Sequence, residues 1–314
     1  MPADQPFRFT VQCSSPKEIT PESWAALARK VEDLGYYSLT VSDHLDEQIA
    51  PIAALMAAAN ATSTLRIGSM LFCNDYRHPV VLAKEAATLD VLSGGRFDLG
   101  LGAGWLATDY ERAGIPLDPP GVRIDRLEEA LAVLKGLFAA EPCHYDGKHY
   151  QVNGLDGTPK PTQRPYPPIV IGGGGKRVLS LAAREADVVA VNMNMHKGVI
   201  DASVGPNATV AATDQKIAWI REAAGERFPA LVLQSRIHLA LVGFDRTETA
   251  NNLAAGFGLT PEEAVGTPHA LFGSVEEIVE DLLIRRERFG FSSIGIAVDA
   301  LDSMAPVVAK LAGS

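Results

Sequence analysis

The chain of 314 residues contains 28 Lys and Arg against 38 Asp and Glu, which gives a formal net charge of −10. We expect neither a nucleic acid nor an anionic membrane as a partner of so acidic a chain, because both bind to net basic faces. Apolar residues make up 47% of the sequence and charged residues 21%, which is typical of a soluble globular enzyme. The length suffices for one large domain or for two ordinary ones.

The cysteines favour a reducing compartment. Cys13, Cys73 and Cys143 are far apart and odd in number, so they predict neither a disulfide framework nor a CxxC metal or redox motif. Residues 1–10 lack the charged and apolar regions of a secretory signal. The longest apolar stretch, residues 49–61, is shorter than the about 20 residues that span a bilayer. We therefore expect a cytoplasmic protein without a metal site.

Strand patterns alternate with helix patterns through the first hundred residues. We expect strands at 7–12, 37–41, 65–72 and 96–102. Thr20-Pro21 is typical of a helix start, and the apolar residues that follow it recur at helical spacing until Gly35. Further helices are expected at residues 52–61 and 79–92, the second closed by two glycines.

The same alternation continues to the end of the chain. A helix at 124–138 leads into a polar stretch in which Asp146-Gly147 predicts a hairpin turn. Ser274 and Glu277 have the spacing of a helix capping box. The remaining expected elements are strands at 169–171, 187–191, 231–242 and 292–298 and helices at 177–184, 211–224, near 260–263, after 274 and from about 304.

Eight strands that alternate with helices predict parallel pairing through crossover units. Eight such units favour a (β/α)8 TIM barrel, which takes about 250 residues. A doubly wound open sheet is the alternative, although it usually has fewer strands. We therefore expect a single barrel domain over residues 1–314, with rim insertions near 140–168, 192–210 and 244–268.

In this fold the active site lies at the carboxyl ends of the strands. The strand ends carry no His-x-His after strand one, no carboxylate pair on two strand ends, and no lysine on the late strands. Amidohydrolase, retaining glycosidase and Schiff-base aldolase chemistries therefore fit poorly. What remains is rich in glycine and aromatic residues, with Asp43 and His44 after the second strand. This composition favours a site for a large planar cofactor.

Glycines at two strand ends are candidates for cofactor contact. The run 172–175 precedes Lys176 and Arg177 at a helix start, where backbone N–H groups and the helix dipole favour a phosphate. A tight turn without a ligand is the alternative. Gly102-Ala103-Gly104 lets a flat ring approach the backbone. His44 is a candidate acid or base, and the alternative for His44 and Asp43 is a hydrogen-bonded pair at the rim.

Several motifs together resemble the bacterial luciferase-like monooxygenase superfamily, and in particular its F420-dependent oxidoreductase branch. The resemblance covers most of the chain. It rests on Ser42-Asp43-His44, on the block from Asn74 to Arg96, on Gly100-Leu101-Gly102-Ala103-Gly104-Trp105, on Gly114-Ile115-Pro116, and on the segments 168–175 and 182–187.

The resemblance implies a barrel that holds the deazaflavin F420 or, alternatively, FMN, and it implies a homodimer. His44 would lie beside the reacting centre of the cofactor ring. A non-proline cis peptide would fall near Ser69-Met70 and contact that ring. Contacts to the rest of the cofactor would come from Asp43, Gly102, Ala103, Gly104 and Trp105, and the phosphate would bind at Gly173, Gly174, Gly175 and Lys176.

Trp105 departs from the F420-dependent sugar-phosphate dehydrogenases, in which the resemblance leads us to expect a glutamate after Gly-x-Gly. An aromatic wall suits an apolar substrate, and Tyr76 and Phe272 are further candidates for substrate contact. We therefore expect F420-dependent hydride transfer to or from a small organic substrate. The alternatives are an FMN-dependent monooxygenase that uses reduced flavin and O2, and a flavin- or deazaflavin-binding protein without turnover.

Overall fold

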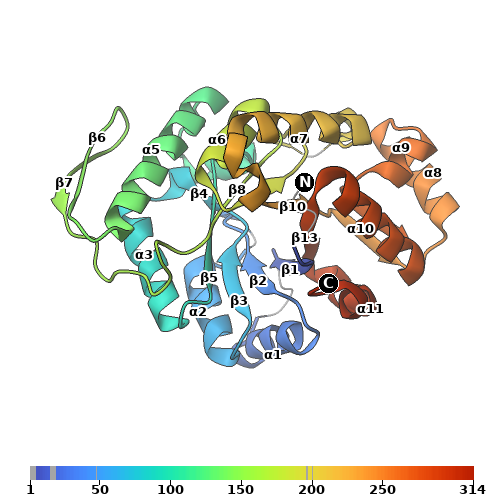
Figure 1. The fold of residues 1–314 in the computed structure, drawn as a ribbon, viewed down its shortest axis with the longest axis horizontal. Helices are drawn as coiled ribbons and strands as arrows, with labels where there is room; N and C mark the ends of the chain where they lie inside the picture. Colours follow the sequence, from blue (N-terminus) through green and yellow to red (C-terminus); the bar gives the residue numbers. More distant parts are fainter. Residues whose placement is uncertain (1–4, 15–18, 47, 196, 200) are drawn as a thin grey trace.

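A closed barrel of parallel strands forms the centre of the computed structural model (Figure 1), which describes residues 5–14, 19–46, 48–195, 197–199 and 201–314. The strands follow one another as β3-β2-β1-β13-β10-β9-β8-β5, and pairing between β3 and β5 closes the ring. The bounds are β1 Arg8–Cys13, β2 Ser38–Val41, β3 Arg66–Ser69, β5 Phe97–Gly102, β8 Ile169–Gly173, β9 Val188–Val191, β10 Val232–Arg236 and β13 Phe291–Ala297. The expected (β/α)8 barrel is thus confirmed.

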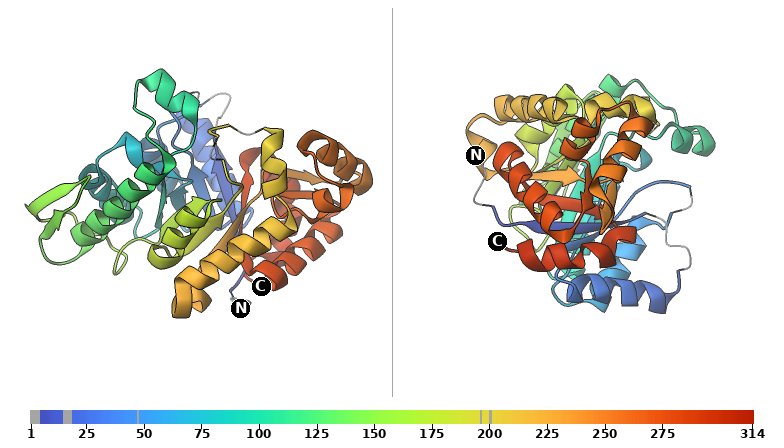
Figure 2. Two further views of the ribbon diagram at one scale, coloured as in Figure 1. Left: turned by 90° about the horizontal axis from the view of Figure 1, so that it is seen from above. Right: turned by 90° about the vertical axis from the view of Figure 1, so that its right-hand side faces the viewer.

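Helices surround this barrel and cover the outer faces of its strands (Figure 2). The N-terminal and C-terminal segments lie side by side, because the Phe7 amide donates to the Ser314 carbonyl and the Gly313 amide to the Phe7 carbonyl. The main helices are α1 Pro21–Asp33, α2 Pro51–Ala61, α3 Pro79–Leu92, α4 Ala107–Ala113, α5 Pro120–Phe138, α6 Lys176–Glu185, α7 Val210–Ala224, α10 Val275–Phe289 and α11 Leu301–Leu311. None of the helices within the described residues is long and apolar enough to cross a membrane.

Local sequence signals account for several of these helix starts. Thr20 and Ser23 form a capping box at α1, and Ser274 and Glu277 form one at α10. In each box two backbone N–H groups that lack a partner within the helix are satisfied by side chains. The helix α4, in contrast, falls in a stretch for which the sequence predicted no element.

The third expected strand is interrupted. Residues 65–72 form β3 up to Ser69 and then the short β4 Phe72–Cys73, followed by the 3₁₀ helix η1 Asn74–Tyr76. A cis peptide joins Met70 to Leu71, one residue later than the sequence predicted. The strand β4 pairs with the last residues of β5, so the interruption lies at the carboxyl end of the barrel.

The expected strand at 231–242 is also two strands. The strand β10 belongs to the barrel, whereas β11 Leu239–Val242 leaves it and pairs in parallel with β12 Ala270–Gly273 in a separate two-stranded sheet. Between these two strands lie α8 Arg246–Phe257 and α9 Pro261–Gly266. The insertion near 244–268 is thus a helical unit beside the barrel (Figure 1).

The other two segments expected as insertions each contain short elements outside the barrel strands. The segment 140–168 contains the antiparallel hairpin of β6 Cys143–Asp146 and β7 Gln151–Leu155, which projects beyond α3 and α5 at the left of Figure 1. The segment 192–210 contains the 3₁₀ helix η2 Ala202–Asn207. Two more 3₁₀ helices, η3 Gly225–Ala230 and η4 Val298–Ala300, join barrel elements.

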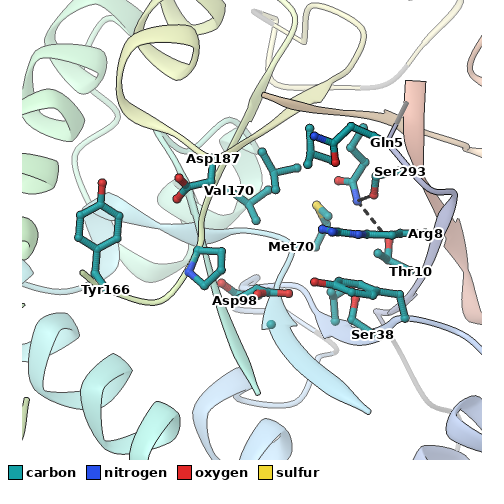
Figure 3. A pocket seen from close by; sticks show the side chains of 18 of the residues that line it. Gln5, Arg8, Thr10, Ser38, Met70, Asp98, Tyr166, Val170, Asp187 and Ser293 are labelled. Carbon is teal, nitrogen blue, oxygen red and sulfur yellow. Dashed lines mark hydrogen bonds between the residues drawn. The ribbon is translucent and has the colours of Figure 1, made fainter. Parts of the chain in front are cut away.

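The strand pattern divides the core into two layers. Residues that face outward are apolar and fully buried against the helices; they include Leu39, Ile67, Leu99, Ile171 and Val189. Many residues that face inward are small or polar. They leave a cavity of ≈ 390 Å³ in the amino-terminal half of the barrel, which Figure 3 shows with Thr10, Ser38, Met70 and Ser293 around it.

Candidate active site

A larger cavity of ≈ 540 Å³ opens at the carboxyl ends of the strands. This volume lies in the range of about 300–1,000 Å³ that is usual for ligand sites. The segments that follow β2, β3, β5, β8, β9 and β10 all contribute to its wall. The cavity brings together most of the site residues expected from the sequence, namely Asp43, His44, Met70, Tyr76, Gly102, Ala103, Gly104, Trp105, Gly173, Gly174, Gly175 and Lys176.

His44 is held in the cavity wall by a carboxylate that the sequence analysis missed. Its Nδ1 lies 2.6 Å from Oδ2 of Asp109, whose side chain has no exposed surface. The Leu45 amide donates to the other oxygen of Asp109 at 3.3 Å. Trp105 packs edge-on against the His44 ring at a centroid distance of 5.8 Å. Asp109 and Trp105 together fix the orientation of the imidazole, because one bonds its nitrogen and the other restricts its rotation.

Two tyrosines extend this network beneath the cavity. The Tyr76 hydroxyl donates to Oδ2 of Asp109 at 3.0 Å, and the Tyr110 hydroxyl donates to Oδ2 of Asp75 at 2.9 Å. Burial raises the pKa of both phenols, so both remain protonated donors at neutral pH. Tyr76 lines the cavity as expected, but its hydroxyl is bonded to Asp109 and supports His44.

Asp43 is already occupied by protein groups. Its two oxygens accept from Arg77 at 2.7 and 3.0 Å, and Oδ2 also accepts from the Cys73 amide at 2.9 Å. A bidentate guanidinium pair of this kind is strong and geometrically specific. The expected role of Asp43 in cofactor contact therefore stays a prediction, and the structure gives Asp43 the task of joining β2 to β4.

The residues around the cis peptide divide between the two cavities. Met70 lines both. The Leu71 side chain fills space beside Gly100, Gly102 and Gly172, where added Cβ atoms would lie 2.9–3.4 Å from its methyl groups. Ser69 does not line the larger cavity; its hydroxyl donates to the Gly100 carbonyl at 2.8 Å. The expected contact between Ser69 and a cofactor is therefore corrected to a structural bond between β3 and β5.

The glycine run is explained in part by packing. A Cβ on Gly174 would collide with the Met193 backbone, and one on Gly173 would collide with Val178. A Cβ on Gly175 would have only one atom within 4 Å, the side-chain nitrogen Nδ2 of Asn194 at 3.8 Å. Both interpretations of the run thus have support: the turn requires small residues, and the same residues expose the start of α6 to the cavity.

Phe272 lies outside the cavity. It belongs to β12, is 2% exposed, and packs in a separate apolar cluster with Ala250, Ala254, Ala264 and Ala270. The expected substrate contact is therefore wrong for this side chain. The reason is that the chain leaves the barrel after β10, which places the whole β11–β12 unit beside the barrel.

The structure also adds polar residues that the sequence analysis did not select. Asn192, Arg236 and His238 line the cavity wall formed by the ends of β9 and β10. His238 Nε2 lies 2.8 Å from Oδ1 of Asn192. Asn192 follows the strand predicted at 187–191, whereas Arg236 and His238 were hidden because the sequence predicted one strand through 231–242, so a strand end at Arg236 was not considered. Among the described residues no cluster of His, Cys, Asp and Glu could hold a metal ion.

Comparisons with known proteins agree with this architecture. The model of the family described as luciferase-like monooxygenase matches residues 6–205. The chain is 33% identical over 190 residues to an F420-dependent glucose-6-phosphate dehydrogenase of Microbacterium testaceum, and this alignment covers 58% of this chain and 55% of that protein. It is 30% identical over 158 residues to an FMNH2-dependent dimethylsulfone monooxygenase of Pseudomonas putida, and this alignment covers 50% of this chain and 42% of that protein.

The chain thus spans about half the length of each of these two curated relatives. The solved structure of the F420-dependent tetrahydromethanopterin reductase from Methanopyrus kandleri superposes with a TM-score of 0.76 at 17% identity, over 98% of this chain and 99% of that one. At this identity the likeness concerns the fold alone. The family match, which extends over more than half of the sequence, decides the assignment: the chain belongs to the luciferase-like monooxygenase family.

Proposed function

We propose that this protein is an F420-dependent oxidoreductase that transfers a hydride between the bound deazaflavin and a small organic substrate. The observation that carries the proposal is the His44–Asp109 pair in the wall of the larger cavity. A histidine whose one nitrogen is fixed by a buried carboxylate can exchange a proton through the other nitrogen. Nε2 of His44 has no hydrogen-bond partner among the described residues.

The cavity has the properties that a large planar cofactor requires. Glycine backbone forms two of its walls, at Gly102–Gly104 and at Gly172–Gly175, and the Met70–Leu71 segment forms its floor. Lys176 and Arg177 at the start of α6 line the same cavity. The first amides of a helix have no partner within it and attract a phosphate. We expect the ring to lie over the floor and the phosphate to bind at α6.

F420, when bound, supplies a carrier that takes up or releases a hydride. The protein then has to move one proton in the same reaction. When a hydride leaves a carbon of the substrate, His44 accepts the proton of the adjoining hydroxyl at Nε2, and in the reverse direction it returns that proton. Asp109 keeps Nδ1 occupied and stabilises the charge that His44 acquires. Trp105 forms an apolar wall beside the imidazole.

Two observations favour F420 over FMN: the resemblance to F420-dependent oxidoreductases and the cations at the rim of the cavity. The F420-dependent relative from Microbacterium testaceum is 33% identical over the aligned part. F420 carries a long anionic tail, which needs cations along the rim of the cavity. The Lys176 side chain is 59% exposed, and its ammonium lies 3.7 Å from the Glu222 carboxylate, so this weak surface pair leaves the ammonium available.

FMN-dependent monooxygenation is the second candidate. The relative that favours it is the FMNH2-dependent enzyme from Pseudomonas putida, at 30% identity. The same cavity and the same His44–Asp109 pair would serve this chemistry, since they orient a ring and supply a proton in either case. The cofactor therefore has to be identified by binding.

The decisive experiment titrates the purified protein with oxidised F420, reduced F420 and, without oxygen, reduced FMN. The proposal expects fluorescence changes that saturate with F420 at concentrations at least tenfold lower than with FMN, an order of magnitude that corresponds to about 1.4 kcal/mol. Tight binding of reduced FMN without affinity for F420 would refute it and support the monooxygenase.

A third possibility is a binding protein without turnover. Stopped-flow measurement of F420 absorbance, with a panel of alcohols, aldehydes and enones, distinguishes it from an enzyme. In an enzyme His44→Ala slows hydride transfer and leaves F420 affinity nearly unchanged, because His44 contacts the reacting atoms. Tight F420 binding with no reactive substrate in the whole panel would favour the binding protein.

A further inference from the structure

Arg236 stands out among the arginines of the larger cavity, because it has no carboxylate partner among the described residues. It is the last residue of β10 and lines the cavity. One guanidinium nitrogen donates to the Gly295 carbonyl at 3.2 Å, and the guanidinium has no second hydrogen-bond partner among the described residues. Guanidinium has five N–H donors in a fixed planar fork, so most of them remain available.

The other arginines that line the cavity are neutralised or saturated. Arg177 pairs with Asp125 on the surface. Arg123 donates to the backbone carbonyls of Asp118, Ala103 and Gly104. These arginines are used by the protein itself, whereas Arg236 keeps donors for something else.

The surroundings of Arg236 are positive. Lys216 is fully buried behind the wall, and its ammonium donates to the Asn192 and Asn207 carbonyls at 2.9 and 2.7 Å, without a carboxylate partner in the part of the chain that the structure describes. Burial lowers the pKa of Lys216 to about 8 and that of Arg236 to about 10. Both groups therefore still carry charge at neutral pH, in a chain whose net charge is −10.

His238 and Asn192 complete the wall around this guanidinium. The loss of solvation and the charge of Arg236 lower the pKa of His238 to about 4, so its imidazole is neutral at pH 7. The one N–H of this neutral imidazole, at Nε2, donates to Oδ1 of Asn192 at 2.8 Å, so His238 orients the carboxamide, whose NH2 group can donate to an oxygen atom. The corner thus combines one available cation with a carboxamide donor, and none of the described residues places a carboxylate against this guanidinium.

A desolvated cation without a counterion is unfavourable, and an oxyanion that enters the cavity removes this penalty. Arg236 ends β10, whereas His44 follows β2, and the strands β1 and β13 separate the two around the barrel. One molecule in the cavity can therefore place an anionic end at Arg236 and another part at His44.

We propose that the substrate carries an oxyanion, such as a carboxylate or a sulfonate, that Arg236 and Asn192 form its binding subsite, and that His238 orients the Asn192 carboxamide. This inference rests on the proposed function, since it takes the larger cavity as the substrate site. It adds to the apolar wall at Trp105: the substrate is amphipathic, with an unsaturated or apolar body and an anionic end.

The test compares three probes of one shape: benzoate, benzenesulfonate and the neutral benzamide. Their binding to the cofactor-loaded protein is measured by isothermal titration calorimetry, with a parallel series on protein without cofactor. We expect the two anions to bind at least tenfold more tightly than benzamide. Equal affinities for the anions and benzamide would overturn the proposal.

Variants assign the preference to a residue. Arg236→Met should abolish the discrimination between benzoate and benzamide, and Arg236→Lys should retain part of it, because lysine keeps the charge but loses the planar fork. Arg184→Gln, which removes an equal charge from an exposed pair with Glu128, should leave the discrimination unchanged. If Arg236→Met does not fold, the lysine variant together with the wild-type probe series decides.

The oxyanion at Arg236 could instead belong to the cofactor. In that case Arg236→Met would weaken cofactor binding at least tenfold, and the loaded protein would no longer prefer benzoate; this result would overturn the substrate subsite. Our proposal expects cofactor affinity within twofold of wild type in the variant. Because the probes are measured with and without cofactor, a wrong cofactor assignment leaves the anion preference intact and is recognised separately.

Discussion

Replacing Asp109 with asparagine tests the central pair of the site. The carboxylate lies 2.6 Å from His44 Nδ1, and its side chain is completely buried. Asparagine has nearly the same shape, so it can still accept from the Tyr76 hydroxyl or the Leu45 amide. It cannot stabilise a positive charge on His44. The variant should therefore fold and bind cofactor while the proton-dependent step slows.

The size of the effect follows from the geometry. A hydrogen bond to a charged group contributes about 1.5–3 kcal/mol, and each 1.4 kcal/mol corresponds to about a factor of ten in rate. We therefore expect Asp109→Asn to lower the rate of hydride transfer about 10- to 150-fold. Tyr76→Phe removes only the hydroxyl that donates to Asp109. Because this hydroxyl acts on His44 only through Asp109, we expect a smaller decrease of about two- to tenfold.

The assay is single-turnover kinetics of F420 absorbance, with cofactor affinity and thermal unfolding measured on the same samples. A second measurement compares His44→Gln with the double variant that also carries Asp109→Asn. If Asp109 acts through His44, its replacement should have little further effect once His44 is gone. An equal slowing in both backgrounds would refute the reasoning and assign Asp109 to another task.

Three further predictions concern stability and are measured by urea unfolding. Gly104→Ala should lower the unfolding free energy by about 2 kcal/mol or more, because its φ is +76° and the new Cβ meets a buried tyrosine hydroxyl. The control Gly114→Ala, at φ +68° with open space around it, should lower it by only about 1 kcal/mol. Equal losses in the two variants would contradict a cost from the contact with the tyrosine. Asp43→Asn should lose about 3 kcal/mol, since Arg77 loses its bidentate partner and keeps only the Glu85 carboxylate at 3.9 Å. Asp46→Asn in an exposed pair should lose less than about 1 kcal/mol. Burial lowers the pKa of His269 to about 3, so the unfolded chain binds a proton that the folded protein does not, and stability falls as the pH drops below about 6.5. His269→Gln should reduce the stability lost between pH 7 and 5 by about 2 kcal/mol, and an unchanged loss would refute this assignment.

Local patterns predicted much of the fold because they reflect local physics. The capping boxes at Thr20 and Ser274 involve residues three positions apart, so the sequence displays both partners. The alternation of strands with helices gave the barrel, since each unit buries one face against the next. The strand-end rule then placed His44 and the segment 102–105 at one cavity, as the structure confirms.

Other features depend on contacts between distant parts of the chain. Residues 231–242 are apolar throughout most of their length, and nothing local shows that the chain leaves the barrel after Arg236. Because the chain leaves the barrel at this point, Phe272 lies outside the cavity, and Arg236 lies at a strand end in the cavity wall.

The sequence by itself determined the fold class, the end of the barrel at which the larger cavity opens, and a histidine in the wall of that cavity, because periodicity and strand ends can be recognised from neighbouring residues. The tertiary structure alone decided what each polar group does there. Asp109 reaches His44 across 65 residues of chain, Asp43 is consumed by Arg77, and Arg236 is left without a carboxylate among the described residues. Which charged groups pair depends on their distance in the folded structure, and the order of residues in the sequence does not show that distance.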